Sequence, residues 1–466
     1  MAPQARDRVC DVNFTTWGRT YRASPARWSQ PRDEAELRAV VARAAADGLR
    51  IRAVGAGHSF TDVAVTDGLL IGLDRLSGAR SVRRRPDGTA LVTVGAGTRL
   101  HELNRLLATR GLAMRNLGDI DRQSVAGAIS TGTHGTGALL GGLATQVRAL
   151  RVVLPDGSVR SVSGDDTPGS PDRELFEVAR LGLGTVGVLS AVTLEVVPAY
   201  LLRSTEQVRP WDEVVEGIDA LFDGHDRFDA YWFPGTDRML TWSHDRVPAP
   251  EAARHRASRR GVLGAARTLG DAARSVLDEE VLANGVLGGV MQVAAAAPRT
   301  VPRLNAVCAA ALGDRTHVAP SDRVMVSRRR VRFTEMEYAL PRAGLADALR
   351  ELEGWLRASG EPVPFPVEVR CAAADDVWLS TARGRDTAYV AVHQYHRMPR
   401  ERYFAAAEEI FLAAGGRPHW GKLHTRTAAD LAAHYPLDDV ARVRAAVDPH
   451  GVLRNDYTDR VLGLPA

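Results

Sequence analysis

Residues 49–59 have the sequence LRIRAVGAGHS. Apolar and polar side chains alternate over residues 49–54, which is typical of a β-strand with one buried face. The strand runs into a loop that contains Gly55, Gly57 and His58. Glycines let a backbone approach a ligand closely, and consecutive N–H groups can bind an anion. The stretch therefore predicts a strand that ends in a phosphate-binding loop.

The segments on either side predict a mixed α and β chain. Acidic residues at Asp33-Glu34, apolar spacing of three and four, and Gly48 predict a helix before the first strand. Further along, we expect strands at Val324–Phe333, Val363–Arg370 and Tyr389–Tyr395, helices at Gly344–Ser359 and Arg402–Ala414, and an Ala- and Arg-rich helical region at 250–315. The pattern indicates an α+β fold.

Two more glycine-containing loops resemble the first in chemistry. Residues 124–137 have the sequence SVAGAISTGTHGTG, which is rich in hydroxyl groups and glycine, and residues 182–187 have the sequence GLGTVG. A packing corner of small residues would have the same composition. Three such loops nevertheless suit one extended diphosphate ligand better than three unrelated turns.

The GLGTVG stretch also matches the GxGxxG fingerprint of dinucleotide-binding folds. That motif is meaningful only when a strand precedes it and a helix follows, because the helix N-terminus binds the pyrophosphate. Here a helical pattern at Glu174–Leu181 precedes the motif, and β-branched residues at Val188–Val197 follow it. The reversed order argues against an NAD-type Rossmann site.

Composition and charge exclude several classes of protein. With 45% apolar and 25% charged residues among 466, the chain has a globular balance. Lys and Arg total 60 against 56 Asp and Glu, and their dispersal argues against nucleic-acid binding. Cys10, Cys308 and Cys371 lack the spacing of a metal site or a disulfide framework, so we expect no metal and a reducing, cytoplasmic setting.

Membrane insertion is also disfavoured by the pattern of apolar residues. The first residues lack the apolar core of a signal peptide. The longest uncharged stretch, Val281–Ala297, is shorter than the ~20 apolar residues that a membrane span needs. We expect a buried or surface-associated helix there, which leaves peripheral membrane association open.

Four side chains are candidates for the chemistry. On the predicted strand at 363–370, Glu368 and Arg370 share one face, and His393 lies on one face of the next predicted strand. Either face could point to solvent or to a cavity. Lys422 is the only lysine of the chain and follows Trp420-Gly421, so a partly desolvated ammonium is an alternative to a solvated turn.

Several stretches, in order along nearly the whole chain, resemble the sugar-1,4-lactone oxidase family of vanillyl-alcohol-oxidase-type FAD enzymes. They are residues 54–67 (VGAGHSFTDVAVTD), 124–137, 182–189, 366–380 (PVEVRCAAADDVWLS), 419–422 (HWGK) and 448–457 (DPHGVLRNDY). The resemblance implies an FAD-binding domain of the PCMH type with two subdomains (1–200). It also implies a substrate-binding cap domain, with an antiparallel sheet flanked by helices (201–435), and a C-terminal segment that returns to the FAD domain (436–466).

The resemblance also implies the cofactor and the site residues. FAD would be held covalently through His58, Glu368 and Arg370 would line the substrate site, and Lys422 would lie near the flavin. His393, which matches less securely, would be a second candidate base. The FAD-binding residues would be Gly55, Ala56, Gly57, His58, Ser59, Ser124, Gly127, Ser130, Thr131, Gly132, Thr133, His134, Gly135, Gly184, Val186, Gly187 and Lys422.

The implied activity is the oxidation of a sugar-1,4-lactone of the D-arabinono, L-gulono or L-galactono type. The hydride passes to flavin N5, and O2 or another acceptor reoxidises the flavin. An alditol or a secondary-metabolite alcohol is an alternative substrate on the same fold, because residues 250–315 match the family least well. A flavin-holding protein without turnover, or a peripheral membrane module that uses Val281–Ala297, is the alternative of another class.

Overall fold

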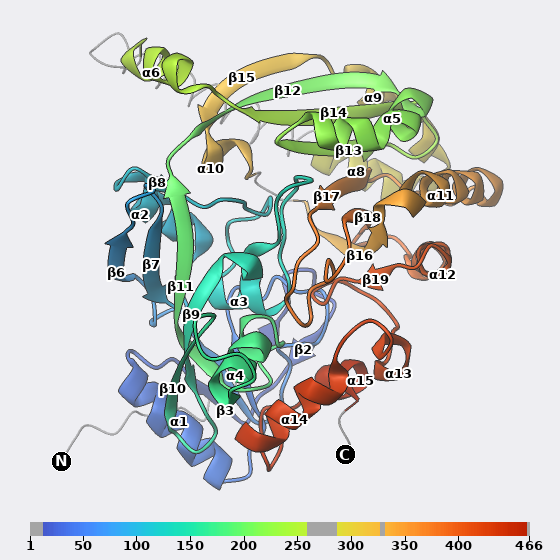
Figure 1. Cartoon of the computed structure of the whole chain (residues 1–466). Helices are drawn as coiled ribbons and strands as arrows, with labels where there is room; N and C mark the ends of the chain where they lie inside the picture. Colours follow the sequence, from blue (N-terminus) through green and yellow to red (C-terminus); the bar gives the residue numbers. More distant parts are fainter. Residues whose placement is uncertain (1–12, 259–286, 327–330, 464–466) are drawn as a thin grey trace.

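The strand predicted around residues 49–54 is β4 (Ile51–Val54) in the computed structural model, which describes residues 13–258, 287–326 and 331–463 (Figure 1). It belongs to a parallel three-stranded sheet with β5 (Leu69–Gly72) and β3 (Arg27–Ser29). The predicted helix is α1 (Glu34–Ala46), which begins where the Asp33 side chain accepts a hydrogen bond from the backbone N–H of Glu36. The start of the chain therefore folds as its local pattern predicts.

A second, antiparallel sheet follows. Its strand order is β10-β9-β11-β7-β6, with the short β8 paired to β11. The strands are β6 (Ala79–Arg84), β7 (Ala90–Gly95), β8 (Leu112–Ala113), β9 (Val147–Val153), β10 (Val159–Ser163) and β11 (Val188–Pro198). The accompanying helices are α2 (Leu100–Ala108), α3 (Val125–Ser130), the 3-10 turn Leu143–Gln146 and α4 (Pro171–Arg180). Since α4 precedes the GLGTVG stretch and β11 follows it, the structure confirms that this motif does not open a Rossmann helix.

The third sheet has eight antiparallel strands in the order β15-β12-β14-β13-β17-β18-β16-β19. They are β12 (Leu201–Pro210), β13 (Arg227–Trp232), β14 (Arg238–Arg246), β15 (Arg315–Pro320), β16 (Phe333–Pro341), β17 (Val367–Ala372), β18 (Thr387–Tyr395) and β19 (Arg417–Pro418). One face packs against α5 (Trp211–Gly224), α11 (Leu345–Ser359) and α12 (Glu401–Ala413) in a continuous hydrophobic core. The opposite face carries polar residues and forms the site described below.

Two strand predictions in this region need correction. The predicted strand at 324–333 is wrong at its start, because residues up to Val324 belong to the short helix α10 (Ser321–Val324) and β16 begins only at Phe333. The strand predicted at 363–370 is β17 but begins at Val367. Pro364 and Pro366 lack the N–H groups that a sheet ladder requires. The helices predicted at 344–359 and 402–414 are present as α11 and α12.

The Ala- and Arg-rich region is helical in its described parts. It contains α6 (Ala249–Ser258), α8 (Leu287–Ala296), the 3-10 turn Pro298–Thr300 and α9 (Val301–Ala311), while residues 259–286 lie outside the described part of the chain. The prediction for Val281–Ala297 is therefore tested only from Leu287 onward, where α8 is found. Among the described helices, none combines the length and the apolar character that crossing a membrane requires.

The C-terminal helices α13 (Ala428–Leu431), α14 (Leu437–Val447) and α15 (Asp456–Leu462) pack against the hydrophobic core of the first two sheets. The backbone N–H of Ile51 donates to the carbonyl of Val452 at 2.6 Å. The Asn455 side-chain amide donates to the carbonyls of Asp62 (2.8 Å) and Val65 (3.0 Å). The end of the chain thus stabilises β4 and the loop that follows it.

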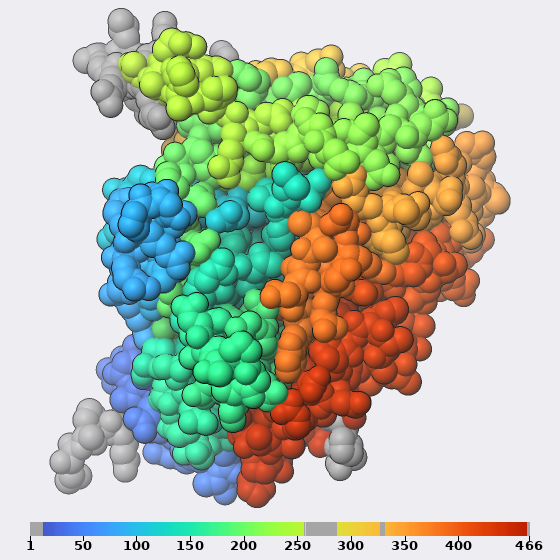
Figure 2. Space-filling model, in the orientation of Figure 1, coloured from blue at the N-terminus to red at the C-terminus, as the bar shows by residue number. Residues whose placement is uncertain are grey.

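The polar face of the large sheet is turned toward the first part of the chain. The backbone N–H of Gly137 donates to the carbonyl of Cys371 at 2.9 Å, and that of Ala373 donates to Leu140 at 3.1 Å. Figure 2 shows the orange surface that follows β17 in direct contact with the teal surface of residues near 140. The site therefore lies between the hydrophobic core of the first two sheets and the helix-covered core of the large sheet.

Candidate active site

Strand alternation places the predicted acid and guanidinium in a cavity. On β17, Val367, Val369 and Cys371 enter the helix-covered core, so Glu368 and Arg370 point to the opposite face. There they line a cavity between the sheet and the glycine loops, with about 730 Å³ of empty space that is partly open to solvent. His58, His393 and Lys422 line the same cavity.

Arg370 is surrounded by carboxylates. Its guanidinium forms an ion pair with Glu368, and its Nε donates to Asp229 at 3.2 Å. Asp119 lies 3.7 Å away, and the Tyr231 hydroxyl donates to Glu368 at 2.7 Å. Burial alone would lower the pKa of Arg370, but the carboxylates outweigh it and raise this pKa well above its ordinary value. Arg370 is therefore a fixed positive charge.

Lys422 is held beside β16, next to the short edge strand β19 of the same sheet. Its Nζ lies 2.5 Å from Glu335 on β16 and 5.3 Å from the centroid of the Phe60 ring. The backbone N–H of the next residue, Leu423, donates to the carbonyl of Glu335 at 3.0 Å, which fixes the loop. Burial would lower the pKa of Lys422, but Glu335 and Glu337 outweigh it and raise this pKa. The only lysine is thus a half-buried, charged ammonium.

His393 faces Glu335 across the β16–β18 register. Its Nδ1 lies 3.1 Å from the carbonyl oxygen of Pro366, and because a carbonyl can only accept, Nδ1 carries the hydrogen. Its Nε2 is therefore directed to the cavity side, 3.6 Å from a Glu335 oxygen. Burial raises the pKa of Glu335, but the Lys422 ammonium opposes it and this pKa is lowered, so Glu335 is a carboxylate.

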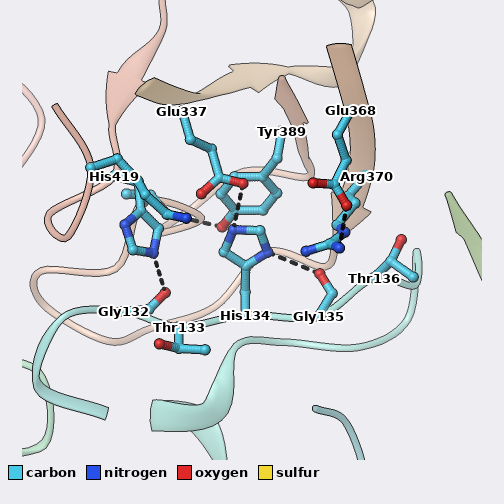
Figure 3. A network of polar contacts seen from close by, with 12 residues as sticks. Gly132, Thr133, His134, Gly135, Thr136, Glu337, Glu368, Arg370, Tyr389 and His419 are labelled. Carbon is cyan, nitrogen blue, oxygen red and sulfur yellow. Dashed lines mark hydrogen bonds and ion pairs between the residues drawn. The ribbon is translucent and has the colours of Figure 1, made fainter. Parts of the chain in front are cut away.

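A second acid and imidazole pair lies deeper in the cavity (Figure 3). His134 Nε2 is 3.2 Å from Glu337, while its Nδ1 donates to the Gly135 carbonyl at 2.9 Å. The imidazole stacks on Tyr389 with ring centroids 3.6 Å apart. Burial raises the pKa of Glu337, but the neighbouring His134 and Lys422 outweigh it and lower this pKa well below its ordinary value.

His134, Glu337 and His419 come close enough to suggest a metal site. However, His419 Nε2 donates to the carbonyl of Gly132 at 3.1 Å, and its Nδ1 accepts from the backbone N–H of Gly421 at 3.0 Å. Both ring nitrogens are engaged, and burial lowers the pKa of His419 to about 4, so the ring is neutral. In the described part of the chain, this cluster is a hydrogen-bond network and offers at most two free ligands.

Glu335 and Glu337 are site residues that the sequence analysis does not single out. They alternate with Met336 and Tyr338, so a period of two is available as a signal. The predicted strand ends at Phe333, and both carboxylates lie beyond it. Their burial against Lys422 and His134 is a property of the folded sheet.

The predicted glycine loops meet at a neighbouring cleft with about 820 Å³ of empty space, part of which is open to solvent. It is lined by Gly55, Ala56, Gly57, His58 and Ser59 after β4, by Ser124, Gly127, Ser130 and Thr131 around α3, and by Gly184 and Gly187 before β11. A side chain at Gly55 would place a Cβ 2.1 Å from the Ser124 hydroxyl, and Gly57 has a φ of 65°. Both positions require glycine.

The cleft fits a dinucleotide with a diphosphate centre. Within the described residues, no backbone N–H group of residues 55–59 donates a hydrogen bond to the protein, so these donors are available to an anion. His58, Ser59, Gln123 and Thr131 line both the cleft and the active-site cavity, which lets one long ligand extend from one into the other. The shape and the donor set are those that FAD requires.

The remaining predicted cofactor residues have different positions. Thr133 and His134 line the active-site cavity, and the carbonyls of Gly132 and Gly135 accept hydrogen bonds from His419 and His134. Val186 is buried in the first hydrophobic core and is not among the described residues that line the cleft, so its role as an FAD-binding residue stays a prediction. Its side chain supports the loop at residues 182–187 from the side of the hydrophobic core.

His58 connects the two cavities. Its ring lies 5.8 Å from that of Trp17, and burial together with Arg99 and Lys422 lowers its pKa to about 4. The imidazole is therefore neutral at physiological pH and keeps a lone pair on one ring nitrogen.

Comparisons with known proteins agree with this geometry. Residues 192–461 match the family model for D-arabinono-1,4-lactone oxidase, and residues 25–163 match that for an FAD binding domain. The chain is 41% identical to an L-gulono-1,4-lactone dehydrogenase of Mycobacterium tuberculosis, over 97% of this chain and 99% of the relative. It is 31% identical to an L-gulonolactone oxidase of Bos taurus, over 97% and 98%. A cholesterol oxidase from Brevibacterium sterolicum shares the fold, with a TM-score of 0.73, 18% identity, and coverage of 97% and 96%.

Proposed function

The chain belongs to the D-arabinono-1,4-lactone oxidase family, and from this premise we propose that it is an FAD-dependent oxidoreductase of sugar-1,4-lactones. The substrate class comes from the family. The observation that carries the proposal is the cavity in which Glu368, Arg370, His393 and Lys422 converge beside the glycine-lined cleft. An aldonolactone is uncharged and rich in hydroxyl groups, which suits a cavity whose charged groups are paired with one another.

Oxidation of the carbinol next to the lactone carbonyl requires the loss of a hydride and of the hydroxyl proton. FAD, when bound, supplies the hydride acceptor. We infer that His393 Nε2 takes the hydroxyl proton, because Nδ1 is held by Pro366 and Nε2 lines the cavity. The Glu335 carboxylate, 3.6 Å away, then stabilises the imidazolium.

Glu368 and Arg370 have a binding role in this proposal. The Glu368 carboxylate already accepts from Tyr231 and pairs with Arg370, so it is better suited to orienting substrate hydroxyls than to taking a proton. Arg370 donates to the lactone oxygens. Lys422, with Arg370, supplies positive charge that favours the reduced, anionic state of a flavin bound in this cavity.

The cofactor is proposed to lie along the cleft, with its diphosphate on residues 55–59 and its reactive ring in the active-site cavity. We also propose that His58 links covalently to it, since its neutral imidazole lies where the two cavities join. Acid precipitation of the purified protein tests the link. A yellow pellet supports it, and a colourless pellet with yellow supernatant excludes it while leaving FAD as the cofactor.

The domain limits are proposed from the two cores. Residues 1–200 with 436–466 would form the FAD-binding domain, and residues 201–435 the cap that carries the substrate site. Cys308 and Cys371 are free thiols, which favours a reducing, cytoplasmic location for the protein. Cell fractionation tests the location, including association with membranes.

Anaerobic flavin bleaching tests the proposed activity. L-gulono-, L-galactono- and D-arabinono-1,4-lactones are each mixed with the oxidised holoenzyme, and absorbance near 450 nm is followed. Bleaching by at least one lactone supports the proposal, whereas bleaching by an alditol alone would replace it. Readmission of oxygen then shows whether O2 or another acceptor takes the electrons.

A further inference from the structure

A second pocket adjoins the active-site cavity on the same polar face of the large sheet. It has about 400 Å³ of empty space, part of which is open to solvent, and shares Asp119 and Arg370 with the cavity. The central strands β13 and β14 contribute Arg227, Trp242 and His244 to its walls. None of these three residues is singled out by the sequence or used in the reaction above.

The walls of this pocket contain buried nitrogen atoms without hydrogen-bond partners among the described residues. Arg227 is 1% exposed, and its Nη2 donates to the carbonyl of Arg115 at 2.7 Å and to the Tyr200 hydroxyl at 2.9 Å. Among the described residues, its Nε and Nη1 have no hydrogen-bond partner, and neither do Trp242 Nε1 and His244 Nδ1. Buried polar groups are normally satisfied, so such a cluster around one pocket indicates a ligand that brings acceptor atoms.

The charges of the pocket favour a neutral ligand. Arg227 and Arg370 are balanced by Asp119 and Asp229, which line the same pocket. Asp229 Oδ1 accepts from Arg370 Nε at 3.2 Å, and Asp229 Oδ2 lies 3.6 Å from His244 Nε2. An anion would leave an excess of negative charge, whereas hydroxyl oxygens can accept from the free donors and donate to the carboxylates.

We propose that this pocket binds the hydroxylated carbon chain that a sugar-1,4-lactone carries outside its ring. The inference rests on the proposed function. Arg370 connects the two sites, because its guanidinium contacts Glu368 in the active-site cavity and Asp229 in the second pocket. A lactone ring held at Arg370 places its exocyclic hydroxyls next to Arg227 and Trp242. These two residues are thus positioned to set the preference for chain length.

Trp242→Phe tests the proposal, because it removes the unpartnered N–H and keeps an aromatic ring. Three substrates share the ring configuration and differ in the exocyclic chain: D-threono-1,4-lactone has none, D-arabinono-1,4-lactone has one hydroxymethyl group, and L-galactono-1,4-lactone has a two-carbon diol. The control is Trp232→Phe, on the opposite face of β13, where the indole N–H already donates to the Thr236 carbonyl at 2.9 Å.

We expect Trp242→Phe to lower kcat/KM for the two substituted lactones by ~3- to 10-fold, the worth of one hydrogen bond, and to leave threono-1,4-lactone unchanged. The unfolding midpoint of the substrate-free holoenzyme should stay the same or rise, because the N–H loses no protein partner. Trp232→Phe should lower that midpoint without changing the ratios. Arg227→Gln provides a second variant, with a larger loss for the longer chain.

Equal effects of Trp242→Phe on all three lactones would overturn the pocket assignment and leave the proposed function intact. The assignment also fails if gluconate, an open-chain carboxylate, stabilises the wild type but not the variant while the chain-length ratios stay unchanged, because the pocket is then an anion site. If no lactone bleaches the wild-type flavin, the proposed function and the pocket assignment both fall.

Discussion

Replacing Glu335 by Gln tests whether the ion pair with the Lys422 ammonium contributes to stability and to flavin reduction. The substitution keeps the size of the side chain but removes the charge that lies 2.5 Å from Lys422 Nζ and 3.6 Å from His393 Nε2. Glu335 is 5% exposed, so water replaces little of the lost interaction. Of the two carboxylates that raise the pKa of Lys422 most, only Glu337 then remains.

The size of the effect follows from the geometry. At 2.5 Å and an effective dielectric constant of ~20, Coulomb's law gives an attraction of ~7 kcal/mol, most of which is offset by desolvation. Removing one partner of a buried pair costs ~3–5 kcal/mol. Because Glu337 remains, we expect a loss at the lower end, ~3 kcal/mol in the free energy of unfolding.

The pH dependence has a definite sign. The pKa of Glu335 is lowered from 4.5, so its contribution to stability is present above that value and is lost as the pH falls through the lower folded pKa. The pKa of Lys422 is raised from 10.5, so its contribution is present below that value and is lost as the pH rises through the higher folded pKa. The pair therefore stabilises the protein throughout the neutral range.

Stopped-flow flavin reduction from pH 6 to 10 measures the catalytic consequence. The raised pKa of Lys422 keeps the alkaline limb of the rate profile above this range in the wild type. In Glu335→Gln, burial is opposed by less negative charge, so the pKa of Lys422 falls and the limb moves to lower pH. Glu353→Gln, which breaks an exposed pair with Arg357, is the control and should change stability by less than ~1 kcal/mol. An unchanged alkaline limb with unchanged stability would refute the reasoning.

Three further predictions concern the cofactor, the substrate and metals. Gly55→Ala places a Cβ 2.1 Å from the Ser124 hydroxyl, so the purified protein should contain less FAD per chain by absorbance. Gly217→Ala, which meets nothing within 4 Å in a helix interior, should stay yellow and be ~0.5–1 kcal/mol more stable. Arg370→Lys keeps the charge but loses the planar guanidinium, whose several N–H groups contact both Glu368 and Asp229. We expect kcat/KM to fall ~10²–10³-fold at full flavin content. Dialysis against EDTA should leave the rate unchanged, because both ring nitrogens of His419 are engaged.

Local sequence patterns are sufficient for the parts of the site that depend on neighbours in the chain. The period of two along residues 367–372 places Glu368 and Arg370 on one face, and the structure directs that face into the cavity. Gly55 and Gly57 are recognisable as loop glycines because a close approach and a positive φ leave few alternatives to glycine. The failure at 324–333 arises from β-branched residues in a segment whose start is helical.

The partners of these residues cannot be obtained in the same way. The order and the register of the eight strands determine these partners. They bring Lys422 to Glu335, and they place Arg370 among Glu368, Asp229 and Asp119. They also leave Arg227 and Trp242 with donors that have no partner among the described residues. Periodicity determines which way a side chain points. The residue it meets is determined by long-range pairing, because contacts across a sheet join segments whose separation along the chain carries no local signal.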